Sequence, residues 1–122
     1  MDRHLKKIVA LSDLIENVST SDLLDVSLCF GHFNVIHPGH LRYFQIARTH
    51  GKRLVVALES DQALSQTQIG EWFPESERAS AVAALEIVDH VVILDTGTLE
   101  VLVSLIKPQS LVLGREFEQE RS

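Results

Sequence analysis

The chain has 122 residues, enough for one domain with a real hydrophobic core, and 45% of them are apolar, as is typical of globular proteins. Its net charge of −6 argues against a general nucleic-acid-binding surface, and no apolar run approaches the roughly 20 residues of a membrane span. Because Cys29 is the only cysteine, no internal disulfide can form, and we expect a cytoplasmic protein that binds neither nucleic acid nor membrane.

Apolar residues recur at roughly helical spacing near the N-terminus and predict a helix over residues 3–17. Polar and acidic residues interrupt this stretch, so it does not read as a signal peptide, and we expect residues 1–24 to form a helical segment packed on the domain. The uninterrupted apolar run over residues 26–30 predicts a central parallel strand that is buried on both faces. Cys29 falls inside that strand, where we expect an inert small hydrophobe rather than a nucleophile.

A glycine turn and a helix start follow this strand over residues 31–40, which read GHFNVIHPGH. Gly31 allows a tight turn, Pro38 suits the first turn of a helix, and Gly39 leaves room for a ligand near the backbone. His37 and His40 are three residues apart, so at a helix start they share a face. Two imidazoles, backbone N–H groups and the positive end of a helix would then converge, which suits charge developing on a phosphoryl group.

Two other interpretations of this stretch are weaker. A zinc site is disfavoured because His-x-x-His has no acidic or cysteine ligand nearby and lacks the i, i+4 spacing of helical zinc pairs. A nicotinamide-binding domain would need G-x-G-x-x-G after the first strand, whereas histidines follow Gly31 here.

Helices and strands alternate along the rest of the chain. A helix is predicted over residues 38–50, with Gly51 as its stop and a packing face formed by Leu41, Phe44, Ile46 and Ala47. The elements expected after it are a strand over 54–58, a short helix near 62, a helix over 74–87, a strand over 91–94, a helix over 99–106 and a strand over 111–113. This alternation implies right-handed β-α-β units, and so an α/β, Rossmann-like three-layer fold with a parallel sheet flanked by helices.

Two alternative roles stay open for each of three further residues. Asp61 follows the second strand, where ligand-facing residues concentrate, and it either contacts a ligand or caps the short helix that begins there. Trp72 and Phe73 end a polar loop, and they either anchor that loop by packing or cover a base.

The pattern Gly31-x-Phe33-Asn34-x-x-His37-x-Gly39-His40 resembles the G-x-F-D/N-x-x-H-x-G-H signature of the cytidylyltransferase-like nucleotidyltransferases. The similarity is closest to the adenylyl- and cytidylyltransferase domains that activate phosphorylated sugars and polyols, such as heptose phosphate and glycerol phosphate. Shorter matches follow in the family's order: Ser60-Asp61 after the second strand, Pro74-x-x-Glu77-Arg78 at a helix start, Val88-Asp89-x-Val91 at the third strand, and Leu111-Val112-Leu113-Gly114 at the fourth.

This resemblance implies transfer of a nucleotidyl group from CTP or ATP to a phosphorylated sugar or polyol, with release of pyrophosphate. It implies that His37 and His40 are catalytic and donate hydrogen bonds to the α-phosphate. The nucleotide- and phosphate-binding positions that it implies are Gly31, His32, Phe33, Asn34, Gly39 and Gly114, with Asp61 and Arg78 as candidates on the substrate side. Mg²⁺ would bind mainly through the substrate phosphates, so no protein metal site is expected. The family's habit of pairing near its P-x-x-E-R helix implies a homodimer.

The chain also departs from the family pattern. Asn34 stands where many members have Asp, His32 replaces a small residue, and the loop after the second strand contains no lysine. The family's late I-S-S/T-T-x-x-R motif is missing, so we expect residues 25–122 to be a nucleotidyltransferase domain truncated at its C-terminus. These departures keep open an alternative, a non-catalytic nucleotide-binding or assembly module built on the same fold. Neither the base nor the acceptor can be chosen from these residues.

Overall fold

The computed structural model describes residues 3–19, 26–64, 72–95, 97–106 and 110–113. In chain order the elements are a 3-10 helix η1 (Arg3–Lys7), α1 (Leu11–Ser19), β1 (Val26–Gly31), α2 (Pro38–Arg48), β2 (Arg53–Glu59), α3 (Asp61–Leu64), α4 (Glu75–Ala83), β3 (His90–Leu94), α5 (Leu99–Ile106) and β4 (Ser110–Leu113). Within the described ranges, no helix is both long and apolar enough to cross a bilayer.

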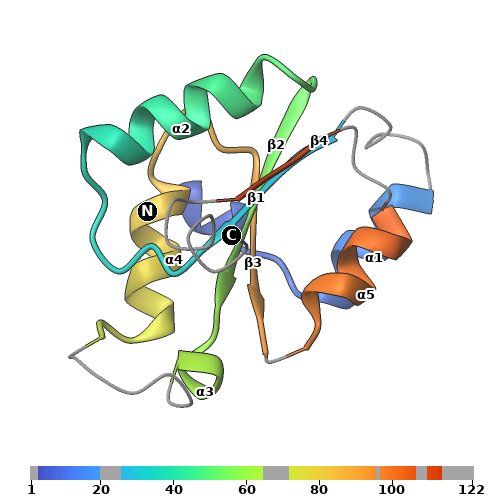
Figure 1. Ribbon diagram of the computed structural model, residues 1–122. Coiled ribbons are helices and arrows are strands. Elements are labelled where there is room, and N and C mark those ends of the chain that lie inside the picture. Colours follow the sequence, from blue (N-terminus) through green and yellow to red (C-terminus); the bar gives the residue numbers. More distant parts are fainter. Residues whose placement is uncertain (1–2, 20–25, 65–71, 96, 107–109, 114–122) are drawn as a thin grey trace, which may run out of the picture.

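Within the described residues, four strands form one sheet in the order β3-β2-β1-β4, and their pairings are parallel. Helices α2 and α4 cover one face of the sheet and α1 and α5 cover the other (Figure 1). The predicted Rossmann-like three-layer fold is therefore confirmed. Because the chain runs outward from β1 through β2 to β3 and then crosses to β4, the strand order reverses between β1 and β4. Ligands bind in open α/β sheets at the carboxyl ends of the strands beside such a reversal.

Each face of the sheet has its own hydrophobic core, because successive side chains of a strand point to opposite faces. Under α2 and α4 lie Cys29, Phe33, Phe44, Ala47, Leu54, Val56, Leu58, Ala79, Val82, Ala83, Val88 and Val91. Under α1 and α5 lie Leu14, Val26, Leu28, Phe30, Val55, Ala57, Val92, Leu94 and Leu102. Burial raises the pKa of the Cys29 thiol to about 12, as suits an inert core residue.

The predicted single helix over residues 3–17 is wrong. The structure has the short 3-10 helix η1, then an extended stretch in which Ile8 forms a parallel bridge with Val91 and the Val9 N–H donates to the Val91 carbonyl at 2.9 Å. Only after this stretch does α1 begin, and Leu14 of α1 is fully buried. The N-terminal segment thus contributes a bridge to the edge of the sheet as well as a helix. The predicted boundary after residue 24 lies outside the described residues.

Two helices are shorter than predicted. Helix α2 ends at Arg48, before Gly51, and of the four residues assigned to its packing face only Phe44 and Ala47 are buried; Leu41 and Ile46 are exposed. Helix α4 ends at Ala83, so the apolar residues at 85 and 87 follow it in a turn. The apolar side of α4 (Ala79, Val82 and Ala83) lies in the core of this chain, so the homodimer expectation rests on the resemblance alone.

Candidate functional site

The candidate site lies at the carboxyl edge of the sheet, where β1 ends at Gly31, level with Leu58 of β2. The chain then turns through Phe33, whose φ of +50° lies in the left-handed region that non-glycine residues rarely adopt. The ring of Phe33 is 2% exposed and packs on Phe44, with centroids 5.3 Å apart. It also meets the ring of His40 edge-on at 5.5 Å. Packing therefore holds a strained turn in place directly under one of the predicted catalytic residues.

His37 and His40 form a reciprocal cap on the N-terminus of α2. The Gly39 N–H donates to Nδ1 of His37 at 3.0 Å, and the His37 N–H donates to Nδ1 of His40 at 3.3 Å. His37 is the N-cap residue, with extended backbone (φ −136°, ψ 173°), and the two rings lie 4.1 Å apart. The prediction that the two imidazoles come together is confirmed. We call residues 37–40 the histidine turn.

These hydrogen bonds fix which ring nitrogen carries the proton. An Nδ1 atom that accepts from a backbone N–H cannot itself be protonated, so the neutral rings of His37 and His40 carry their proton on Nε2. Each ring can therefore present an Nε2–H donor while its other nitrogen stays bonded to the helix start. Donors of this kind, fixed beside the positive end of a helix, suit an anionic oxygen.

The position of the His37 imidazole requires a residue without a Cβ atom at position 39. A Cβ atom at position 39 would lie 2.7 Å from Cε1 and 3.0 Å from Nδ1 of His37, both closer than side chains pack. The close approach that the sequence predicts at Gly39 is thus made in the structure by the imidazole that caps the helix. Whether a ligand also approaches there stays a prediction.

His32 turns its side chain toward β2 and pairs with Glu59. Nε2 of His32 lies 2.9 Å from Oε1 of Glu59, and the two side chains are 24% and 15% exposed. The ring of Trp72 meets that of His32 edge-on at 5.2 Å. The structure thus places three polar or amphipathic side chains together at the carboxyl edge of the sheet. Sequence reasoning named His32 and Trp72 but not Glu59.

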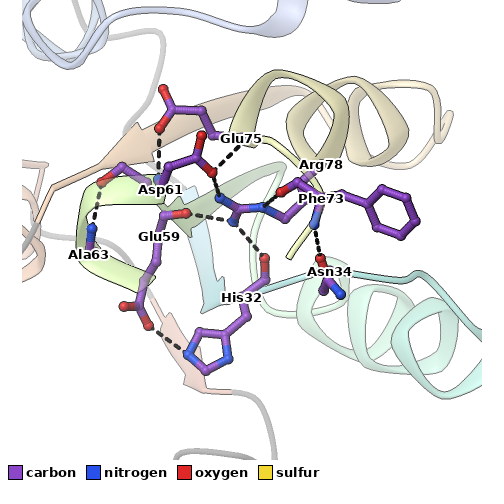
Figure 2. Close-up of polar contacts among 9 residues, drawn as sticks. His32, Asn34, Glu59, Asp61, Ala63, Phe73, Glu75 and Arg78 are labelled. Carbon is purple, nitrogen blue, oxygen red and sulfur yellow. Dashed lines mark hydrogen bonds and ion pairs between the residues drawn. The ribbon is translucent and has the colours of Figure 1, made fainter. Parts of the chain in front are cut away.

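Arg78, a predicted substrate-side residue, is 1% exposed, and its guanidinium lies between the side chain of Asp61 and the backbone of His32 and Glu59 (Figure 2). Its guanidinium donates to three backbone carbonyls: Nη1 to His32 at 3.1 Å and to Glu59 at 2.6 Å, and Nε to Phe73 at 2.7 Å. Its Nη2 donates to Oδ1 of Asp61 at 2.9 Å. We call Arg78 and these four partners the arginine network. It joins the ends of β1 and β2 to the start of α3 and to the segment that leads into α4.

Asp61 links two helix starts instead of capping its own helix. Its Oδ1 accepts from the Glu75 N–H at 2.9 Å, while its own N–H donates to Oε1 of Glu75 at 2.8 Å. The cap of α3 comes from Ser60, whose Oγ accepts from the Ala63 N–H at 3.1 Å. The predicted cap of the short helix by Asp61 is therefore wrong, because Ser60 supplies it. Asp61 instead accepts from a backbone N–H at the start of α4, and its side chain is about half exposed.

Asn34, a predicted phosphate-binding residue, makes a contact with the α4 side. Its Oδ1 accepts from the Phe73 N–H at 2.7 Å (Figure 2). An aspartate at this position would keep the same acceptor, which explains in physical terms why either residue fits here. Phe73 itself is 52% exposed, so it is no packing anchor within the described part of the chain.

The described residues hold no group of three or more His, Cys, Asp or Glu side chains that could bind a metal ion. The predicted site residues from His32 to His40, together with Asp61 and Arg78, all lie at the carboxyl edge of the sheet. Gly114 and the loop over residues 65–71 are outside the described residues. Sequence reasoning missed Glu59, although its register opposite His32 follows once β1 and β2 are paired.

Known proteins resemble this chain over most of its length. The profile of a family described as cytidylyltransferase-like matches residues 28–120. The chain is 38% identical over 122 residues to the bifunctional protein HldE of Geotalea uraniireducens, covering 98% of this chain and 25% of that protein. It is also 38% identical over 117 residues to the bifunctional protein HldE of Campylobacter fetus, covering 92% and 24%. The chain spans about a quarter of the length of these relatives.

Among solved structures with a similar fold is the lipopolysaccharide core biosynthesis protein from Thermoplasma volcanium, with a TM-score of 0.66 over 71% of both chains and 24% sequence identity. At that identity the likeness supports the arrangement of helices and strands.

Proposed function

Because the chain belongs to the cytidylyltransferase-like family, we propose that it transfers a nucleotidyl group from CTP or ATP to a phosphorylated sugar or polyol and releases pyrophosphate. The observation that carries this proposal is the histidine turn, in which two imidazoles 4.1 Å apart cap one helix start through their Nδ1 atoms. That arrangement presents donors where a phosphate group would meet the end of β1. The substrates are part of the proposal, since the relatives are about four times as long as this chain.

In the proposed reaction an oxygen of the acceptor phosphate attacks the α-phosphorus, and the bond from that phosphorus to the bridging oxygen breaks. The electron pair leaves with pyrophosphate. His37 and His40 donate from Nε2 to the α-phosphate oxygens, where negative charge builds up, and the N-terminus of α2 adds its positive end. No covalent intermediate with the protein is required, because alignment and electrostatic stabilisation lower the barrier.

Mg²⁺ fits this scheme as an ion that arrives with the nucleotide. The polar groups of the histidine turn are imidazoles and backbone N–H groups, whereas Mg²⁺ prefers oxygen ligands. Its ligands would therefore be phosphate oxygens and water. Bound in that way, the ion would neutralise part of the triphosphate charge, which matters for a chain with a net charge of −6.

A second candidate is nucleotide binding without catalysis. Its specific support is Asn34, which supplies no carboxylate and whose Oδ1 is bonded to the Phe73 N–H. Both candidates predict binding of CTP or ATP, so binding does not separate them.

Pyrophosphate release separates the two candidates. It should be measured over a panel of nucleoside triphosphates and sugar or polyol phosphates with Mg²⁺, using this chain and any longer natural form that contains it. Release that requires both substrates supports nucleotidyl transfer. Tight nucleotide binding without release under every combination supports the binding module.

A further inference from the structure

We propose that His32, Glu59 and Trp72 form a subsite for the neutral, hydroxyl-bearing part of the acceptor. This inference rests on the proposed function, because it assigns one half of that reaction's acceptor to a place at the same carboxyl edge of the sheet as the histidine turn. It concerns residues that the family motif does not include, with the exception of the variable position occupied by His32.

Strand register and hydrogen bonds to the backbone fix the positions of His32 and Glu59. His32 directly follows Gly31, which pairs with Leu58, so His32 and Glu59 stand level at the ends of β1 and β2. One atom of Arg78, Nη1, donates to the backbone carbonyls of both residues, at 3.1 Å and 2.6 Å. These backbone contacts fix the spacing between His32 and Glu59 independently of the bond between their side chains. Support of this kind keeps a binding group in a single geometry.

The carboxylate of Glu59 has capacity for another donor. Its Oε1 is taken by Nε2 of His32, and among the residues that the structure describes Oε2 has no hydrogen-bond partner. Hydroxyl groups that donate to a carboxylate form short, charge-assisted hydrogen bonds. A phosphate group, in contrast, would be repelled by Glu59. Glu59 therefore selects the neutral end of a phosphorylated polyol and leaves its phosphate to the histidine turn.

Trp72 gives the subsite an amphipathic wall. Its ring stands edge-on to His32 at a centroid distance of 5.2 Å and is only partly buried. Within the described residues its indole N–H has no hydrogen-bond partner. An indole offers an apolar face and one donor, which suits a molecule that carries C–H groups and hydroxyl groups in alternation.

Trp72 also makes the proposal measurable, because it is the only tryptophan of the chain and its indole N–H gives a single NMR signal. The labelled chain is titrated with glycerol 3-phosphate and with glucose 1-phosphate, and in parallel with inorganic phosphate, which lacks hydroxyl-bearing carbons. We expect glycerol 3-phosphate and glucose 1-phosphate, together called polyol phosphates below, to shift the indole signal. Inorganic phosphate should shift the backbone signals of the histidine turn instead.

The Glu59→Gln variant tests the carboxylate, since the amide keeps an oxygen that can accept from His32. We expect it to weaken polyol-phosphate binding by roughly tenfold, as for the loss of a hydrogen bond to a charged group, and to leave inorganic phosphate binding unchanged. Glu100→Gln, an exposed acidic residue on α5, is the matched control and should change neither.

The proposal is overturned if no polyol phosphate shifts the indole signal, or if Glu59→Gln changes both affinities alike or neither. It is also overturned if adenosine or cytidine shifts that signal in place of the polyol phosphates. These readings do not depend on turnover. Polyol-phosphate binding without pyrophosphate release rejects the proposed function alone, and release with an unchanged acceptor KM in Glu59→Gln rejects the subsite alone.

Discussion

The histidine turn and the arginine network meet at one edge of the sheet but are built in opposite ways. In the histidine turn the capping hydrogen bonds join residues two and three positions apart, and His37 is exposed. In the arginine network one buried guanidinium reaches partners 5, 17, 19 and 46 positions away. The comparison indicates that a pair of adjacent imidazoles can come from a short local motif, whereas the position of that motif relative to the strands depends on distant residues. Changes at each region should therefore have different consequences.

The largest effect is expected from Arg78→Met, which should destabilise the whole fold. The substitution removes the donors to the carbonyls of His32, Glu59 and Phe73, and a methionine side chain offers none in return. Leaving several buried polar groups unpaired should lower the free energy of unfolding by about 3 kcal/mol or more. Urea denaturation measures this loss.

Arg42→Met is the matched control for that experiment, because Arg42 is an exposed arginine on α2. Its free energy of unfolding should stay within about 0.5 kcal/mol of the parent. Arg78→Lys should fall between the two, since one ammonium group cannot span acceptors arranged for a planar guanidinium. A loss below about 1 kcal/mol for Arg78→Met would show that the network is not what joins the two strand ends to α4.

His40→Ala should act in the opposite sense, with a large effect on turnover and a small one on stability. Removing one donor to a developing oxyanion typically lowers the rate about 10²–10³-fold. The capping bond from the His37 N–H is lost as well, which costs about 1 kcal/mol of stability. Pyrophosphate release and thermal melting measure the two effects. His50→Ala, an exposed histidine just beyond the other end of α2, should leave both near the parent values.

The same contrast explains which parts of the fold the sequence could predict. All four strands and the helix over residues 99–106 were predicted, because buried parallel strands are continuous apolar runs and the helix follows a clear turn. The prediction of a single helix over residues 3–17 was wrong because the bridge from Ile8 to Val91 depends on a strand that lies far along the chain. Ile46 was wrongly placed in the core since periodicity cannot say how wide the buried stripe of a helix is.

The site follows the same rule. The meeting of His37 and His40 could be predicted because three residues at a helix start bring side chains together. The role of Arg78 could not, because its four partners come from three separate stretches of the chain and only the folded sheet brings them within reach. Glu59 is an intermediate case. Its position beside His32 can be predicted once the register of β1 and β2 is known, but not from the sequence alone.

Gly39→Ala sharpens the comparison further, because it should disturb the histidine turn without removing a reactive group. The new Cβ would lie 2.7 Å from Cε1 of His37, so the imidazole must leave its position. A shift of about 1 Å in a catalytic group can lower the rate about 10²-fold. Stability should change by less than about 1 kcal/mol, because the higher helix propensity of alanine offsets the lost cap.

Gly97→Ala is the control for this variant. Gly97 has a φ of +82° but has nothing within 4 Å of its would-be Cβ, so alanine is strained there without touching the site. It should lower stability by about 1 kcal/mol and leave turnover unchanged. If Gly39→Ala lost stability and kept turnover in the same way, His37 would not need its capping position for catalysis.

The smallest effect is expected at the amino-terminal ends of the strands, away from the candidate site, where His90 begins β3. Burial lowers the pKa of His90 below its usual 6.5, nearby Arg53 and Lys7 lower it further, and Asp89 partly opposes them. Its Nδ1 is buried without a hydrogen-bond partner among the described residues. As the pH falls below about 6.5, the unfolded chain therefore takes up a proton at position 90 more readily than the folded chain does. Stability should fall with pH in that window and level off below the pKa of the folded state.

His90→Gln removes this proton uptake, so its free energy of unfolding should fall less than that of the parent between about pH 7.5 and pH 5.5, in urea titrations at each pH. Gln45→Ala is the control, because Gln45 is an exposed residue of α2 that takes up no proton, so its slope should equal that of the parent. Equal slopes for the parent and His90→Gln would place the acid sensitivity in other groups. A slope flattened to the same extent in Gln45→Ala would mean that the change does not come from the imidazole of His90, and the effect assigned to that buried histidine would be rejected.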